Sequence, residues 1–329
     1  MDKNKIFITR KLPGKALDLL ARYFKVEVFK YDRPITKMEL KKALKDKVGL
    51  IALLTDNIDE EIMAGAPYLK IIANYAAGYN NIDIAAATRR GIIVTNTPDV
   101  LTDTTADLTF GMILALARRI PEAESYLRAG KFKGWAPMLF LGSDVHHKTL
   151  GIIGMGRIGR AVAQRAQGFG MFIIYYDKIR LPLKQEKEYG IVYRPLNYIL
   201  RHADFITIHT PLTPETHHLI GEKELALMKK TAFLINTARG PIVHEKALVK
   251  ALKEKKIAGC ALDVFEFEPR VSKELLKMRN VLLLPHIGSA TLETRTNMAL
   301  MCAKNLITAL IKHKTPPNLV NPEVLKINT

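Results

Sequence analysis

The clearest chemical signal in the sequence is a glycine-rich run at Gly154, Gly156 and Gly159. It follows an apolar stretch, residues 149–153, that is typical of a β-strand, and it opens a segment with helical periodicity. Glycines at these positions permit a tight turn, close approach of the backbone to a pyrophosphate, and packing of helix on strand. Asp177 ends the next apolar stretch, near the spacing of about 20 residues expected for an acid that binds ribose hydroxyls. The pattern predicts a dinucleotide site with its phosphates at a helix N-terminus.

Three polar residues with complementary chemistry follow other strand-like stretches. They are Arg239 after residues 232–236, Glu268 after residues 260–264, and His286 after residues 281–284. In an open parallel sheet, ligands bind beyond the carboxyl ends of the strands, so the three side chains are expected at one edge beside the glycine motif. An arginine binds a carboxylate through its planar fork, and a histidine transfers protons at neutral pH. Each residue alone could be structural, but their joint placement predicts a site that binds an anion and moves a proton.

The elements that must position these residues alternate between strand-like and helical patterns. The predicted strands are residues 5–9, 26–29, 49–54, 71–75 and 91–95, and then 149–153, 172–176, 205–209, 232–236, 260–264 and 281–284. The predicted helices include residues 14–23, 37–44, 59–66, 103–120 and 292–311, and the polar stretch around Trp135 is expected to be a loop. Such alternation predicts α/β architecture with doubly wound parallel sheets, and the length suits two domains.

Composition narrows the functional classes. The 329 residues carry a net charge of +18, but the basic residues are scattered and aromatic residues make up only 7%, which argues against a nucleic-acid partner. No apolar run approaches the ~18 residues of a membrane span, so no membrane partner is expected. The charged N-terminus lacks the apolar core of a signal peptide, which predicts a cytoplasmic address. Cys260 and Cys302 lack metal-ligand spacing, so we expect buried free thiols and no metal site.

Four segments resemble the signature motifs of the D-isomer-specific 2-hydroxyacid dehydrogenases: residues 154–159, 236–240, 263–269 and 285–291. With residues 75–83 the resemblance covers nearly the whole chain. Residues 135–137 and 168–171 look most like the glyoxylate/hydroxypyruvate reductase branch of that family. The resemblance implies a Rossmann NAD-binding domain, residues 99–290, inserted into a discontinuous flavodoxin-like substrate domain, residues 1–98 plus 291–329, with a cleft between them.

The resemblance also implies a role for each motif residue. Arg239 would bind the substrate carboxylate and keto oxygen, His286 would donate the proton, and Glu268 would pair with His286. The backbone of Ala77 and Gly78 would hold the substrate carboxylate from the other domain. The residues expected to contact the cofactor are Thr104, Gly154, Gly156, Arg157, Ile158, Gly159, Asp177, Thr210, Pro211, Thr237, Ala238, Asp263 and Gly288.

The implied activity is NAD(H)-dependent reduction of small 2-keto acids, and glyoxylate or hydroxypyruvate is the favoured substrate. A 3-phosphoglycerate or D-lactate-type dehydrogenase stays open as an alternative, because specificity depends on loops such as residues 53–56 and the Trp135 region. An NAD(H)-sensing corepressor with the same fold is a more distant alternative.

Two further expectations concern the cofactor and the assembly. Asp177 favours NAD(H), although Lys178 and Arg180 follow directly and an arginine there is the usual device for holding NADP(H). NADP(H) therefore stays open. The segment 103–148 carries apolar residues such as Phe110 and Phe140, and their combined apolar surface is larger than a lone domain should expose. This surface predicts a two-fold homodimer.

Overall fold

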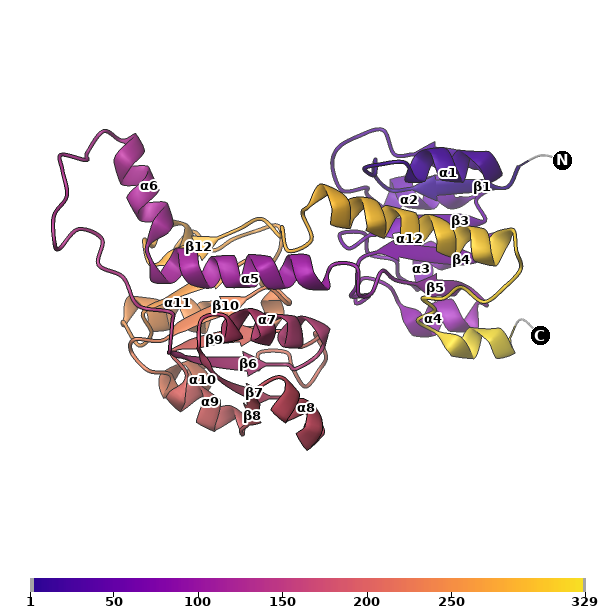
Figure 1. Ribbon diagram of the computed structural model, residues 1–329. Helices are drawn as coiled ribbons and strands as arrows, with labels where there is room; N and C mark the ends of the chain where they lie inside the picture. Colours follow the sequence, from indigo (N-terminus) through magenta and orange to yellow (C-terminus); the bar gives the residue numbers. More distant parts are fainter. Residues whose placement is uncertain (1–2, 328–329) are drawn as a thin grey trace. The chain divides into compact units, whose positions relative to one another are not determined.

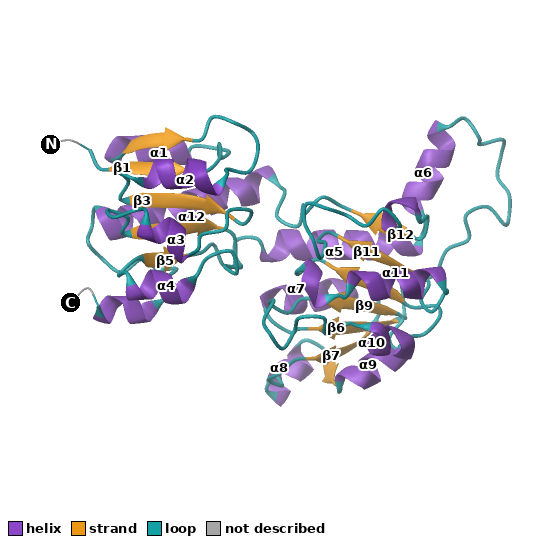
Figure 2. Ribbon diagram, turned by 180° about the vertical axis from the view of Figure 1, so that it is seen from behind, coloured by secondary structure: helices purple, strands orange, loops and turns teal. Residues whose placement is uncertain are grey.

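The computed structural model describes residues 3–327 and forms two compact units. The first unit comprises the described residues up to Leu101 and from Ser289 onward, and the second comprises Thr102–Gly288 (Figure 1). Each unit has a parallel sheet of its own with helices on both faces (Figure 2). The two units are therefore two separate α/β cores.

The first unit is built on a five-stranded sheet in the order β2-β1-β3-β4-β5. Its strands are β1 (Lys5–Ile8), β2 (Lys25–Val28), β3 (Gly49–Leu53), β4 (Ile71–Tyr75) and β5 (Ile93–Thr95). Side chains alternate between the faces, so Ile6 and Ile8 pack under helices α1 and α12, whereas Phe7 packs under helices α2, α3 and α4. These helices are α1 (Ala16–Tyr23), α2 (Lys37–Leu44), α3 (Glu60–Ala64), α4 (Ile84–Arg89) and α12 (Leu292–Leu310).

The second unit is built on a seven-stranded parallel sheet in the order β12-β11-β10-β9-β6-β7-β8. The strands are β6 (Thr149–Ile153), β7 (Phe172–Tyr176), β8 (Ile191–Tyr193), β9 (Phe205–Ile208), β10 (Phe233–Asn236), β11 (Gly259–Leu262) and β12 (Val281–Leu283). Strand order reverses between β6 and β9, and such a switch point opens a crevice for ligands beyond the carboxyl ends of the strands.

Helices cover both faces of this second sheet. One face packs against α5 (Thr102–Ala117) and α7 (Arg157–Gln167), and the other against α9 (Leu196–His202), α10 (Glu222–Leu227) and α11 (Glu245–Lys253). The short helix α8 (Leu183–Glu188) leads into the edge strand β8. With both faces covered, the central strands are apolar throughout, which is the pattern that made them predictable.

Two elements differ from the sequence-based predictions. The edge strand β8 was missed because its three residues, bounded by Gly190 and Pro195, are too few to show a period. Helix α6 (Ile120–Arg128) occupies part of the predicted loop, and the predicted helix 103–120 ends early as α5. The break falls at Arg119, whose φ of 53° is left-handed and whose side chain pairs with Glu122 at 2.9 Å. Helix α6 and the segment after it project away from the sheet of their unit (Figures 1 and 2).

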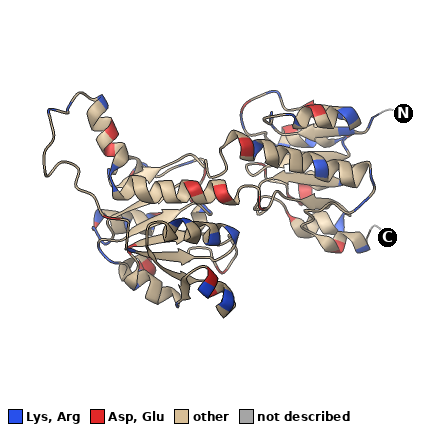
Figure 3. Ribbon diagram, in the orientation of Figure 1, with Lys and Arg blue, Asp and Glu red and all other residues tan. Residues whose placement is uncertain are grey.

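The charged groups and cysteines are placed as the composition suggests. Lys and Arg side chains are spread over the helices and loops of each unit (Figure 3). Cys260 and Cys302 are both buried and free, as predicted, and burial raises the pKa of both thiols. Within residues 3–327 no helix is long and apolar enough to span a bilayer. In the same range no group of three or more His, Cys, Asp or Glu side chains could hold a metal ion.

Candidate active site

The glycine motif forms a tight turn between β6 and α7. Gly154 has a φ of +95°, and a Cβ there would lie 2.7 Å from the backbone of His209 and Thr210. A Cβ on Gly159 would lie 2.2 Å from the carbonyl oxygen of Gly154, so the helix packs directly on the turn. A Cβ on Gly156, the residue that caps α7, would meet no atom within 4 Å. The open space beside a helix N-terminus is suited to a pyrophosphate.

Asp177 is anchored at the same place. Its Oδ2 accepts a hydrogen bond from the backbone N–H of Met155 at 2.7 Å, which ties the end of β7 to the glycine turn. The predicted residues Thr210 and Pro211 follow β9, and the backbone of Thr210 lies against Gly154. The predicted residues Arg157 and Ile158 open α7. The structure therefore brings these predicted cofactor residues together at the carboxyl ends of β6, β7 and β9, an arrangement that fits a dinucleotide.

Arg180 does not have the freedom that a role in binding a 2′-phosphate requires. Its Nε and Nη2 atoms each bind a carboxylate oxygen of Glu186 at 2.8 Å, and its guanidinium lies over the ring of Tyr193. The same carboxylate accepts the hydroxyl of Tyr175 at 2.7 Å. Hydrogen bonding to Arg180 lowers the pKa of Glu186 to about 2, so the pair stays charged at neutral pH. A bidentate ion pair thus occupies the fork of Arg180, the arginine that the sequence offered for holding NADP(H).

Glu268 and His286 follow β11 and β12 and form a pair. Nδ1 of His286 lies 3.1 Å from Oε2 of Glu268, and Oε1 of Glu268 accepts the N–H of Phe265 at 3.0 Å. His286 has a left-handed φ of 55°, and its own N–H donates to the carbonyl of Asp263 at 2.9 Å. Within residues 3–327 no partner hydrogen-bonds to Nε2 of His286. The carboxylate thus orients the ring through Nδ1 and leaves Nε2 available for a reacting group.

Asp263 holds the turn that presents His286. Its two carboxylate oxygens accept the N–H groups of Ile287 at 2.7 Å and Gly288 at 2.8 Å. The carbonyl of Gly288 in turn accepts the hydroxyl of Thr105 on α5. Burial raises the pKa of Asp263, while these two N–H donors and the charge of His286 act in the opposite direction. Asp263, expected near the nicotinamide, thus acts on the backbone of the His286 turn.

The other residues predicted to bind the cofactor lie in helix α5 and just after strand β10. The hydroxyl of Thr237 lies 2.8 Å from that of Thr109, which joins the end of β10 to α5. Thr104 lies in the first turn of the same helix. Ala238 donates its N–H to the side chain of Asn236 at 3.0 Å. These contacts hold in place the residues that sequence analysis predicted to bind the cofactor.

Arg239 is positioned by a turn that Asn236 closes. The side-chain amide of Asn236 donates to the carbonyl of Arg239 at 2.9 Å, a contact that sequence reasoning missed although an Asn at a strand end is a common turn signal. A Cβ on Gly240 would lie 1.9 Å from the backbone of Phe265, so the segment after Arg239 lies against the segment that carries Glu268. Burial lowers the pKa of Arg239, and the charge of Glu268 raises it.

Glu268 lies close enough to both Arg239 and His286 for these two residues to act on its carboxylate. Burial raises the pKa of Glu268, but the hydrogen bond and charge of His286, the N–H of Phe265 and the charge of Arg239 together lower it further. The result is a carboxylate with a pKa below its ordinary value. The structure therefore brings together the three residues that sequence analysis proposed as catalytic.

The first unit presents Ala77 and Gly78 just beyond β4. Asn96 donates to the carbonyl of Ala77 at 2.6 Å, and Asn74 donates to the carbonyl of Gly78 at 2.9 Å. In the described part of the chain, no acceptor is found for the backbone N–H of Ala77 or Gly78. The carbonyls are thus held by amides, and two adjacent N–H groups are left to bind an anion. Sequence reasoning missed Asn74 and Asn96, because their role depends on these tertiary contacts.

A doubly wound sheet with a glycine turn at its switch point, and an acid–base pair beyond the neighbouring strands, defines a dinucleotide-dependent oxidoreductase. The family model described as "D-isomer specific 2-hydroxyacid dehydrogenase, NAD binding domain" matches residues 110–288. The chain belongs to this family of enzymes, as the sequence motifs predicted.

Relatives extend the similarity to nearly the full length. The chain is 53% identical to a glyoxylate reductase of Thermococcus litoralis over 98% of each chain. It is similar to the solved structure of an NADPH-dependent glyoxylate/hydroxypyruvate reductase from Sinorhizobium meliloti, with 32% identity, a TM-score of 0.87 and 98% of each chain covered. It is also similar to a D-lactate dehydrogenase from Aquifex aeolicus solved with NAD and lactic acid, with 29% identity, a TM-score of 0.83, and 96% and 99% of the chains covered. These likenesses favour an enzyme over a corepressor.

Proposed function

We propose that this chain reduces small 2-keto acids, glyoxylate or hydroxypyruvate first, to D-2-hydroxy acids with NADH. The observation that carries the proposal is the Glu268–His286 pair at 3.1 Å, with Arg239 in the adjoining segment. The relatives named glyoxylate reductase, about half identical over nearly the whole chain, support the choice of substrate. We assign cofactor binding to residues 99–290 and substrate binding to residues 1–98 plus 291–329.

Each residue has a defined task in this reaction. A bound nicotinamide would supply the hydride, held by the glycine turn and by Asp177. Arg239 binds the substrate carboxylate and stabilises the negative charge that develops on the keto oxygen. His286 gives a proton to that oxygen, and Glu268 orients the imidazole through Nδ1. The free N–H groups of Ala77 and Gly78 would hold the carboxylate.

The test is steady-state oxidation of NADH with a panel of 2-keto acids. Glyoxylate and hydroxypyruvate are expected to give the highest kcat/KM, ahead of pyruvate and 3-phosphohydroxypyruvate. A highest kcat/KM for pyruvate or for the phosphorylated acid would replace the proposed substrate and keep the enzyme class. No turnover with any member of the panel would contradict the proposal.

We also propose that NADH is preferred over NADPH. The carboxylate of Asp177 lies at the end of β7, where it can accept ribose hydroxyls and repel a 2′-phosphate. Arg180, the cation best suited to that phosphate, is held by Glu186. A few kcal/mol of discrimination corresponds to about 10²-fold in kcat/KM. Equal kcat/KM for the two cofactors in the wild type would contradict this preference.

Release of Arg180 is expected to complete a switch toward NADPH. Asp177→Ser alone removes the repulsion, whereas Asp177→Ser with Glu186→Gln also frees the guanidinium, so the double variant should use NADPH better than the single one. The measurement is kcat/KM for both cofactors in each variant. Glu186→Gln alone is the control and should keep the NADH preference, because Asp177 remains. Equal NADPH efficiency in the single and double variants would show that the ion pair has no part in selectivity.

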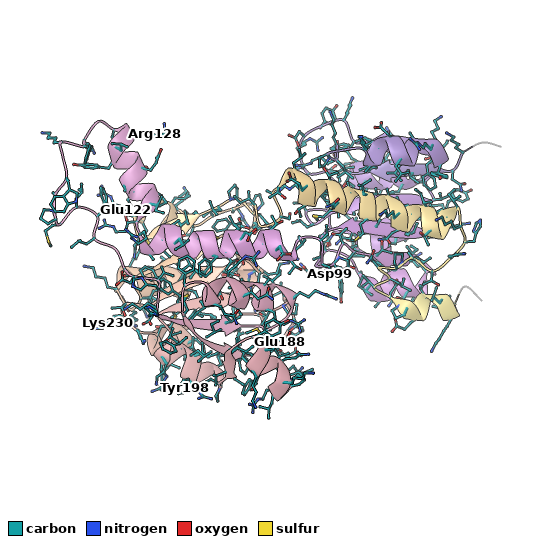
Figure 4. The ribbon with its side chains drawn as sticks, viewed as in Figure 1. Asp99, Glu122, Arg128, Glu188, Tyr198 and Lys230 are labelled. Atoms are coloured by element: carbon teal, nitrogen blue, oxygen red, sulfur yellow. The ribbon has the colours of Figure 1, made fainter. Side chains whose placement is uncertain are left out.

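The α6 arm, residues 120–142, is proposed to form a homodimer. Within its own unit this segment projects from the sheet and exposes apolar side chains, with Trp135 84% and Met138 76% exposed. Figure 4 shows Glu122 and Arg128 along α6, with the remaining arm extending beyond Arg128. A monomeric chain rarely exposes so large an apolar patch, and a second copy is the partner that symmetry provides.

We expect a dimeric mass in solution and a monomer when the arm is made polar. Leu127 on α6 is 60% exposed, so Leu127→Glu adds a charge to the apolar surface without removing a core contact. The measurement is the mass by light scattering at micromolar concentration. Lys131→Glu, a charge change at an exposed polar position in the same arm, is the control. A monomeric wild type would contradict the prediction.

A cytoplasmic location of the protein stays a prediction.

A further inference from the structure

Glu266 lies in the segment that carries Glu268 but takes no part in the proton-transfer pair. Its side chain is 9% exposed, and its two oxygens bind two other elements. Oε1 lies 2.6 Å from Nε2 of His218, and Oε2 accepts the N–H of Glu245 at 2.8 Å. Glu245 is the first residue of α11, and a helix N-terminus stabilises a nearby carboxylate.

Glu245 returns the contact. Its side chain is also buried, its Oε2 accepts the N–H of Glu266 at 3.2 Å, and its Oε1 accepts the N–H of Ser272 at 3.2 Å. Each glutamate thus binds the backbone of the other, an arrangement we name the Glu245–Glu266 clasp. The clasp holds two points of the segment 266–272 on the start of α11.

His218 links this clasp to the segment that carries Arg239. Its N–H donates to the carbonyl of Pro241 at 2.8 Å, and its ring stacks on that of His244 with centroids 4.5 Å apart. The same ring binds Glu266. Pro241 lies two residues after Arg239, so His218 joins the segment of Arg239 to the segment of Glu268.

We propose that Glu266, held by His218 and Glu245, is a positioning residue for the Glu268–His286 pair. Glu268 is fixed to its own segment through the N–H of Phe265, so a displacement of that segment carries the carboxylate with it. The contact with His286 is already 3.1 Å, and a shift of about 1 Å would take it beyond hydrogen-bond range. Glu266 therefore acts on the reaction through Glu268. The inference rests on the proposed function.

Replacing Glu266 with alanine is expected to slow the reaction, because the carboxylate of Glu268 would move away from His286. Glu266→Ala should lower kcat by about 10-fold, less than the ~10²–10⁴-fold that a whole general acid contributes. Glu266→Gln should recover most of the activity, because its amide oxygen still accepts the N–H of Glu245. Affinity for NADH should stay unchanged in both variants.

A double-mutant cycle separates positioning from a general structural loss. In a Glu268→Gln background, Glu266→Ala should lower kcat by no more than about 2-fold, because the partner through which it acts is already gone. The matched control is Glu222→Gln, which removes an exposed carboxylate that pairs with Lys250 of α11 at 2.5 Å. It should leave kcat unchanged in both backgrounds. The same fold-loss from Glu266→Ala in both backgrounds would overturn the proposal.

The NMR chemical shift of His286 Nδ1 tests the inference without turnover. In protein with labelled histidine, Glu266→Ala should move this resonance in the same direction as Glu268→Gln does, because both variants weaken the hydrogen bond between Nδ1 and Glu268. If Glu266→Ala fails to fold, His218→Asn replaces it, since asparagine tolerates the left-handed φ of 53° at that position, and it should move the resonance in the same direction. An unmoved resonance would overturn the inference, whereas a wild type that reduces no 2-keto acid would overturn only the proposed function.

Discussion

Replacing His286 with alanine is expected to lower kcat for reduction by ~10²–10⁴-fold, the usual contribution of a general acid. The imidazole is held through Nδ1 by Glu268 at 3.1 Å, and in the proposed reaction it is the proton donor and not a cofactor ligand. Affinity for NADH, measured by nucleotide fluorescence, should stay nearly unchanged. The measurement is kcat with saturating glyoxylate and NADH. A near-normal kcat would show that the proton comes from another group.

The pH dependence of stability should identify Glu268 as a charged partner in the fold. Because the pKa of folded Glu268 is lowered, its contribution to stability is fully present above the unfolded value of ~4.3 and is lost as pH falls through the lower folded value. Glu268→Gln should therefore remove this part of the fall in the free energy of unfolding at low pH, measured by denaturant unfolding at several pH values. The same pH dependence of unfolding in the wild type and in Glu268→Gln would contradict the pairing.

Replacing Arg239 with alanine is expected to damage both kcat and KM, with a fall in kcat/KM on the order of 10³-fold or more. In the proposed reaction, one guanidinium binds the carboxylate of the ground state and also stabilises the oxyanion that develops later. Its burial makes the charge more effective, because less water screens it. The measurement is the separate determination of kcat and KM for glyoxylate, with NADH affinity as the control.

Lysine at position 239 separates charge from geometry. Arg239→Lys keeps a cation but loses the planar fork, so it should recover part of kcat while KM remains high. If Arg239→Ala raised KM and left kcat unchanged, the side chain would bind only the ground state and would have no role at the oxyanion.

The sequence by itself determined the architecture and the chemistry. Buried parallel strands such as β6 and β10 consist mostly of apolar residues, because helices cover both faces of their sheet. Polar residues therefore gather at the ends of the strands. Gly154 and Gly159 had to be glycines for local steric reasons, so the dinucleotide turn was visible without any tertiary contact. Arg239, Glu268 and His286 could be grouped because parallel topology delivers strand ends to one edge.

Tertiary structure alone decided which charged side chains are free. Arg180 and Glu186 are only six residues apart, yet nothing in their spacing shows that the ion pair would remove the cation from the cofactor site. The clasp joins Glu245 to Glu266 across 21 residues, and His218 reaches Glu266 across 48. Helix α6 buries no side chain, and the left-handed turn at Arg119 that separates it from α5 is a property of the folded backbone. Local pattern thus reports steric and apolar requirements, whereas the pairing of charges depends on long-range contacts that only the folded chain creates.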